Sequence, residues 1–148
     1  MTRSKRMQSV AGIAKNKEKD AARVLAEKRK ILEQQRQRLL ELVNYREEYT
    51  EKFQTSGSQG FNSRQLNEYR IFLDKLNMAI VQQGDRINQL VGECHVCQDN
   101  WFATRTSSKA LDKVVERYKN EELQLQEERE QKDLDERAMR LRPSLFDD

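Results

Sequence analysis

The sequence predicts an all-α protein, a long antiparallel two-helix coiled-coil hairpin whose C-terminal helix projects beyond the first. Charged residues make up 36% of the chain, the same share as hydrophobic residues, which is typical of long helices rather than of a wide core. The 148 residues include one proline and five glycines, so little interrupts helical structure. Apolar residues recur at spacings of three and four on both sides of one loop-like stretch, which indicates two helices with a shared seam.

The first helix is predicted at about residues 10–55. Its seam positions alternate at three and four residues, so they form one stripe along the helix. Val24, Ile31 and Tyr45 widen this stripe. The seam consists of Leu25, Lys28, Leu32, Gln35, Leu39, Leu42, Arg46, Tyr49 and Phe53, with Ala14 and Ala21 upstream.

The turn between the helices is predicted at residues 56–62, where the sequence reads "SGSQGFN". Glycine, serine and asparagine are typical of a loop between two periodic segments. Asn62 can cap the second helix, because Gln65 stands at the capping-box position three residues later. Phe61 can pack on Leu66 as a hydrophobic staple.

The second helix is predicted at about residues 63–141, with a tail at 142–148, because the residue before Pro143 is restricted away from helical geometry. Two rows of residues, each with a spacing of seven, alternate along this helix and form an a/d seam. The whole chain, 1–148, is therefore expected to form a single α-helical hairpin. The seam consists of Leu66, Tyr69, Leu73, Leu76, Ile80, Gln83, Ile87, Leu90, Cys94, Cys97, Trp101, Thr104, Ser108, Leu111, Val115, Tyr118 and Leu125.

The seams also predict which residues meet, because two helices joined by a short loop fold back antiparallel. If Phe53 faces Leu66, the start of the first helix near residue 10 lies opposite residue 109 of the second helix. Roughly thirty residues of the second helix, about 45 Å at 1.5 Å per residue, would then project without a partner. The same register pairs Tyr49 with Tyr69, Leu42 with Leu76, Leu25 with Cys94 and Ala14 with Thr104.

Both cysteines and the only histidine stand together in "CHVC" (94–97). Cys94 and Cys97 occupy consecutive seam positions, where a free cysteine packs as a small hydrophobic side chain. His95 lies about 100° round the helix from Cys94, so an intact helix cannot aim all three residues at one metal ion. Seam packing is the favoured interpretation, with a metal half-site completed by another chain and a redox dithiol as alternatives. No metal or cofactor is expected.

Several functional classes are disfavoured by what the sequence lacks. It has one histidine and no glycine-rich phosphate loop, so we expect no catalytic residues and no enzyme activity. It has no apolar run long enough to span a membrane, and its basic N-terminus has no apolar core of a secretory signal. A cytoplasmic location without direct membrane insertion is therefore expected.

Charge is distributed unevenly along the chain. Residues 1–30 contain ten basic and three acidic residues, a net charge of +7, whereas residues 120–136 have a net charge of −6. Such asymmetry is a hint about partners, although two solvated helix faces are the favoured explanation. The alternative functions that it allows are a basic coiled-coil scaffold and a nucleic-acid or anionic-surface binding protein. Nucleic acid is disfavoured, because the basic segment lacks aromatic residues and its basic residues do not gather on one helical face.

Five stretches, in this order, resemble a known family: "DAARVLAEKRK" (20–30), "LVNYREEYTEKF" (42–53), "NEYRIFLDKLNMAIVQQ" (67–83), Trp101 with "KALDKVVERY" (109–118), and "EEREQKDLDERAMR" (127–140). Their order, spacing and total length resemble the FliJ family of flagellar export proteins, which are soluble parts of the bacterial flagellar type III secretion apparatus. The resemblance covers most of the chain, and "CHVC" is not part of the family pattern.

The resemblance implies a fold similar to the central stalk subunit of rotary ATPases. It implies three partners: the flagellar export ATPase hexamer, the cytoplasmic linker of the export-gate membrane protein, and flagellar export chaperones. The protein would then be required for flagellum assembly, motility and chemotaxis. The export apparatus would hold it peripherally at the inner face of the cell membrane.

The resemblance also implies an export-gate binding patch built from both helices. Tyr45 and Phe72 lie one position off the seam, and exposed aromatic residues are typical interface anchors. Other patch residues coincide with seam positions, so packing explains them equally well. Arg38 and Gln83 flank the patch and depart from the usual pattern. The patch consists of Leu42, Tyr45, Tyr49, Phe72, Leu76 and Ala79.

The projecting part of the second helix, about residues 115–141, is expected to enter the ATPase ring, because it lacks a partner within the chain. Side chains of opposite charge one turn apart, such as Glu128 and Lys132, are spaced for ion pairs that support a solvated helix. The residues expected to contact the ring are Glu128, Arg129, Lys132, Asp133, Asp135, Glu136, Arg137 and Arg140.

Overall fold

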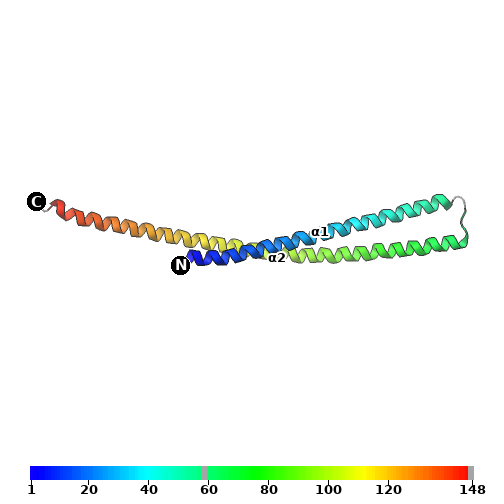
Figure 1. The fold of residues 1–148 in the computed structure, drawn as a ribbon, viewed down its shortest axis with the longest axis horizontal. Coiled ribbons are helices and arrows are strands. Elements are labelled where there is room, and N and C mark those ends of the chain that lie inside the picture. The colour runs from blue at the N-terminus through cyan, green and yellow to red at the C-terminus, as the bar shows by residue number, and fades with distance from the viewer. Residues whose placement is uncertain (58–59, 147–148) are drawn as a thin grey trace. The chain divides into compact units, whose positions relative to one another are not determined.

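The computed structural model describes the backbone of residues 1–57 and 60–146, and the side chains of these residues up to Leu141. It contains α1 (Arg3–Gly57) and α2 (Ser63–Phe146) (Figure 1). No strand occurs in this part of the chain, so the predicted all-α fold is confirmed. Within the same residues, neither helix has an apolar stretch long enough to cross a membrane.

Contacts divide the chain into two compact units, and each helix contributes to both. The first is the hairpin unit, Asp20–Phe102, which contains the turn. The second is the terminal unit, Met1–Lys19 with Ala103–Asp148.

The start of α1 differs from the sequence prediction. α1 begins at Arg3, so the predicted start near residue 10 is wrong. The backbone N–H of Lys5 donates to the hydroxyl oxygen of Thr2 at 3.3 Å. Threonine at this N-cap position satisfies a backbone donor that the first turn leaves without a partner, which stabilises the earlier start.

The capping box at the start of α2 is confirmed. The backbone N–H of Gln65 donates to the side-chain oxygen of Asn62 at 2.8 Å. In return, the backbone N–H of Asn62 donates to the side-chain oxygen of Gln65 at 3.2 Å. These reciprocal bonds fix the first turn of α2 and thereby the place where the chain reverses.

The turn depends on two glycines and one aromatic ring. Gly60 has a φ of 84°, which glycine adopts without strain, and its N–H donates to the carbonyl oxygen of Gly57 at 3.0 Å. Phe61 stacks on Phe53 of α1 with ring centroids 4.2 Å apart. A Cβ atom at Gly57 would lie 2.9 Å from the Phe61 ring, so a side chain there would displace this stack.

The end of α2 also differs from the prediction. α2 continues to Phe146, so the predicted end near residue 141 and the predicted tail are wrong for residues 142–146, whereas residues 147–148 lie outside the described residues. Proline removes one backbone donor and restricts the residue before it, which favours a helix boundary without imposing one. In this chain α2 passes through Pro143 without a break.

In the hairpin unit, α1 and α2 run antiparallel (Figure 1). An apolar seam lies between them. Tyr49 stacks on Tyr69 with ring centroids 5.5 Å apart, which confirms this pair of the predicted register. The seam leucines are largely removed from water, and this burial holds the two helices together. The buried leucines are Leu25, Leu32, Leu76 and Leu90.

Polar pairs interrupt this seam. The side-chain amide of Gln83 donates to the backbone carbonyl oxygen and the side-chain oxygen of Gln35, at 2.9 and 2.8 Å. Polar groups inside a coiled-coil seam satisfy one another in one register only, so they fix the alignment at a cost in stability. Further pairs that cross between the helices are Arg46 with Asn77 at 3.0 Å and Lys28 with Glu93 at 3.2 Å.

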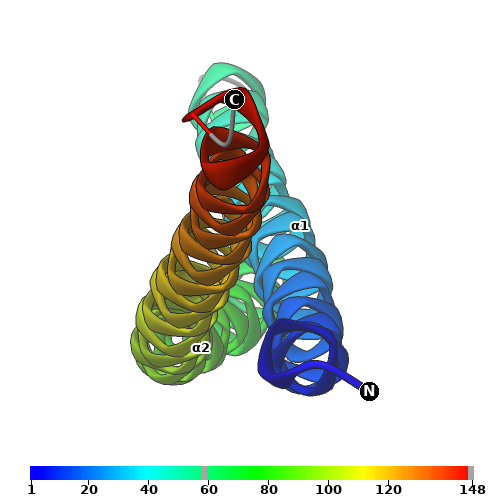
Figure 2. The same ribbon diagram turned by 90° about the vertical axis from the view of Figure 1, so that its left-hand side faces the viewer.

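In the terminal unit, small residues form much of the seam, together with buried Val115. Ala11 and Ser108 are buried, and the seam of α1 continues to Ser4, which is 5% exposed. The N-terminal part of α1 lies beside α2 (Figure 2), and α2 continues past the start of α1 (Figure 1). Leu125, predicted to be the last seam residue of α2, is 53% exposed. The reason is that α1 begins opposite Glu122, so the seam ends there.

Candidate protein-binding surfaces

Aromatic residues of the hairpin unit gather next to the turn. Tyr49 lies in their midst, with its ring centroid 4.5 Å from Phe72 and 6.5 Å from Tyr45. Residues three or four positions apart share a helix face, so Tyr45 and Tyr49 reach across together to Tyr69 and Phe72. Ring pairs at these separations are favourable beyond their burial. We name these six rings the aromatic cluster: Tyr45, Tyr49, Phe53, Phe61, Tyr69 and Phe72.

The aromatic cluster has a packed side and an exposed edge. Phe53 stacks on Tyr69 with ring centroids 3.5 Å apart and is half-buried. Tyr45 is 49% exposed, although the edge of its ring meets Phe72 at a centroid distance of 6.2 Å. Tyr45 is therefore held in place by a neighbour and still presents its ring to a partner, as an interface anchor must.

The structure brings some residues of the predicted export-gate patch together and places others in the seam. Leu76 is 7% exposed, so its place is in the seam below the rings. Leu42 and Ala79 are half-buried. The patch residues whose rings contact one another are Tyr45, Tyr49 and Phe72.

A contact that the sequence analysis missed holds the first turn of α1. The carboxylate of Glu122 accepts hydrogen bonds from the hydroxyl and the backbone N–H of Ser4, at 2.7 and 3.0 Å. These two hydrogen bonds hold the pKa of Glu122 below its ordinary value, and the bond from the Ser4 hydroxyl has the larger effect. The Arg3 guanidinium lies 5.0 Å from the centre of the Tyr118 ring, a cation–π distance. Thr2, an N-cap residue type, was the signal that could have revealed this early start.

The part of α2 after Glu122 is exposed as far as Leu141. The predicted ion pairs one turn apart are not formed among the described side chains of this segment. Side-chain amides take their place: Gln131 donates to Asp135 at 3.2 Å. The charged groups therefore remain available to a partner. The predicted ring-contact residues, all exposed, are Glu128, Arg129, Lys132, Asp133, Asp135, Glu136, Arg137 and Arg140.

The "CHVC" stretch has the placement expected for seam packing. Cys94 and Cys97 are free thiols at half-buried positions, whereas His95 is exposed. Among the described residues, no three His, Cys, Asp or Glu side chains are grouped so that they could hold a metal ion. The two cysteines therefore act in this structure as small seam residues.

Comparison with known proteins gives one consistent similarity. Residues 3–142 match the family described as "Flagellar FliJ protein". The chain is 28% identical to the flagellar FliJ protein of Escherichia coli (strain K12) over 128 residues, which cover 86% of this chain and 87% of that protein. It is 25% identical to the flagellar FliJ protein of Salmonella typhi over 134 residues, 90% of this chain and 91% of that protein. No solved structure matches the chain.

Proposed function

Because the chain belongs to the flagellar FliJ family, we propose that it is a component of flagellar protein export that acts by binding other proteins. It links the hexameric export ATPase to the cytoplasmic linker of the export-gate membrane protein, and it escorts export chaperones. It carries out no catalytic step of its own. Flagellum assembly, motility and chemotaxis depend on it, and the export apparatus holds it at the inner face of the cell membrane.

The export-gate linker binds at the aromatic cluster. Support comes from Tyr45, which is 49% exposed yet packed against Phe72. A fixed aromatic ring loses little conformational freedom on binding, so it contributes more to affinity than a mobile side chain does. Leu76 supports this surface from the seam, and its substitution acts on binding through the position of the rings.

The ATPase binds the exposed charged segment of α2, residues 123–141. Acidic and basic side chains alternate there without a partner on α1, so they are free to pair with charges in a ring lumen. A hexamer closed around a single helix cannot match it by symmetry, so the contacts are loose. Such charged contacts set orientation and association rate more than affinity, and salt weakens them.

The observation that supports a linking role is that the two surfaces belong to different units of the chain. Two partners can therefore bind without competing for the same residues. The test is a pull-down in which the immobilised full chain is saturated with purified ATPase and then given purified gate linker. We expect both partners to be retained together. Displacement of the ATPase by the linker would contradict a linking role.

A further inference from the structure

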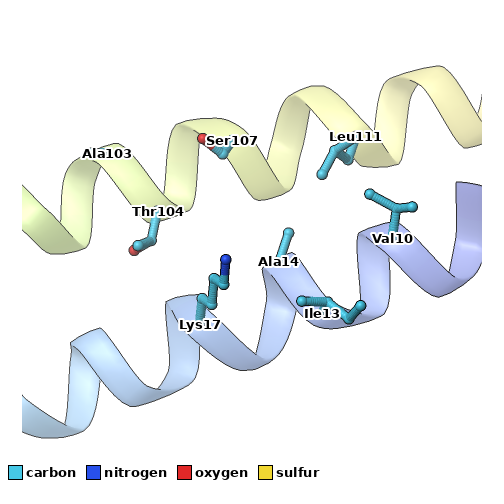
Figure 3. Close-up of a pocket in the computed structure, with 8 residues that line it drawn as sticks. All are labelled: Val10, Ile13, Ala14, Lys17, Ala103, Thr104, Ser107 and Leu111. Atoms are coloured by element: carbon cyan, nitrogen blue, oxygen red, sulfur yellow. The ribbon is translucent and has the colours of Figure 1, made fainter.

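An apolar groove lies between the helices of the terminal unit, with a volume of about 330 Å³. Figure 3 shows Val10 of α1 and Leu111 of α2 pointing toward the opposite helix. On the α2 side, the small residues Ala103 and Ser107 leave the groove open. Val10 is 45% exposed and Ile13 is 59% exposed, so the described residues leave about half of each branched apolar side chain uncovered.

The rim of this groove is basic. Lys17 lines the groove one turn after Ile13, and Arg6 stands one turn before Val10 on the same face of α1. Both basic residues are exposed. An apolar floor with a positive rim fits a helix that has an apolar face and acidic flanks.

The chain itself contains such a helix. Leu123, Leu134 and Leu141 are separated by eleven and seven residues, so they lie within about 20° of one line along α2. They are 55%, 57% and 64% exposed, respectively. Glu127 and Glu130 lie on the same face between Leu123 and Leu134, and Arg137 lies on it between Leu134 and Leu141. Six acidic and four basic residues give residues 123–141 a net charge of −2. We name this face the leucine stripe.

We propose that the groove receives the leucine stripe of a second copy of the chain. A copy cannot fill its own groove, because α2 runs unbroken from Leu111 away toward the stripe. In an antiparallel pair the contact is reciprocal: if Leu134 of one copy lies beside Ser107 of the other, the reverse contact forms as well. Such a two-fold arrangement closes on itself and buries two grooves and two stripes at once.

The dimer uses a segment that the proposed function assigns to the ATPase ring, although the inference does not depend on that function. A ring that takes up α2 would compete with the second copy for residues 123–141. The dimer would then be the state of the chain before it meets the ATPase.

Sedimentation velocity of the full chain, over a range of concentrations and at low and high salt, tests the proposal. We expect a monomer–dimer equilibrium that shifts toward monomer as salt screens the charges. Leu134→Gln should raise the dissociation constant about tenfold or more, since it puts a polar group into an apolar interface. Ile13→Glu should weaken the dimer from the groove side.

Met139→Gln is the matched control. Met139 is 71% exposed in the same helix but lies about 160° round from Leu123, off the stripe. It should leave the dissociation constant unchanged, and circular dichroism should show equal helicity in both α2 variants. A full chain that stays monomeric at every concentration in low salt would overturn the proposal. An equal loss in Met139→Gln and Leu134→Gln would do the same, because the stripe would then have no special role.

Discussion

Ser4 and Glu122 join the first turn of α1 to α2, through two hydrogen bonds of 2.7 and 3.0 Å to one carboxylate. The carboxylate also lies at the positive end of the α1 dipole, where negative charge is favourable. This contact marks the last paired level of the terminal unit. The described side chains of α2 beyond Glu122, residues 123–141, are exposed.

This contact predicts a pH dependence. Because the pKa of Glu122 is lowered in the folded chain, its contribution to stability is present above the ordinary value of 4.5 and is lost as the pH falls through the lower folded value. An NMR titration of the Glu122 carboxyl should therefore have a midpoint below 4.5. Ser4→Ala removes the hydroxyl donor and should raise that midpoint. The same midpoint in both proteins would show that the hydroxyl bond is absent in solution.

The exposed edge of the aromatic cluster predicts a separation of binding from stability. Tyr45→Ala should weaken binding to the gate linker while changing the free energy of unfolding by less than about 1 kcal/mol, because the ring is half exposed. Leu40→Ala, at a residue that is 54% exposed on α1 and outside the cluster, is the control and should leave binding intact. Calorimetric titration and thermal unfolding measure the two effects. Equal weakening by both variants would mean that the cluster is not the binding surface.

The packed side of the aromatic cluster predicts a loss of folding stability when one of its rings is removed. Tyr49 contacts Tyr45, Tyr69 and Phe72, so Tyr49→Ala removes several ring contacts and leaves a cavity. We expect the free energy of unfolding to fall by about 2–4 kcal/mol in chemical denaturation. A loss as small as that of Tyr45→Ala would show that the rings do not pack in solution as they do here.

The glutamine pair predicts a stability gain at the expense of specificity. Replacing both Gln35 and Gln83 with leucine should raise the free energy of unfolding by about 1–3 kcal/mol, because an apolar pair replaces a polar one in the seam. The variant should also lose uniqueness of register, seen as extra resonances in its NMR spectrum. A lower melting temperature would contradict the seam position of this pair.

The seam positions of the two cysteines predict that their replacement affects stability and not partner binding. Cys94→Ala with Cys97→Ala should lower stability modestly and leave binding to both partners unchanged, because the thiols only fill the seam. Metal analysis of the purified chain should find no stoichiometric zinc. One zinc ion per chain, or loss of partner binding in the double variant, would return the metal half-site to consideration.

The spacing of apolar residues in the sequence was sufficient to predict how the two helices pair near the turn. The three-and-four pattern predicted the Tyr49–Tyr69 pair, and the Asn62–Gln65 capping box marked the start of α2. The pattern failed at the N-terminus because Ser4 is not apolar, although it occupies a seam position. Only the cap at Thr2 pointed to the longer helix.

The binding surfaces were less predictable, for two physical reasons. The exposure of Tyr45 followed from its place one position off the seam, but burial of Leu76 in the same patch became evident only once the helices were packed. Leu123 and Leu134 lie off the seam at a spacing of eleven, so a search for the seam passed over them. The groove at Val10 depends on small residues from a distant part of the chain, which one segment alone cannot reveal.

A chain truncated after Leu125 separates the two proposed surfaces in one experiment. It keeps the hairpin unit and Glu122 but lacks the predicted ring-contact residues. Stimulation of the purified export ATPase should fall relative to the full chain, most clearly at low salt, where charged contacts are strongest. Binding to the gate linker and cooperative melting should remain as in the full chain. If the truncated chain stimulates the ATPase as strongly as the full chain does, the exposed segment of α2 is not the ATPase-binding surface.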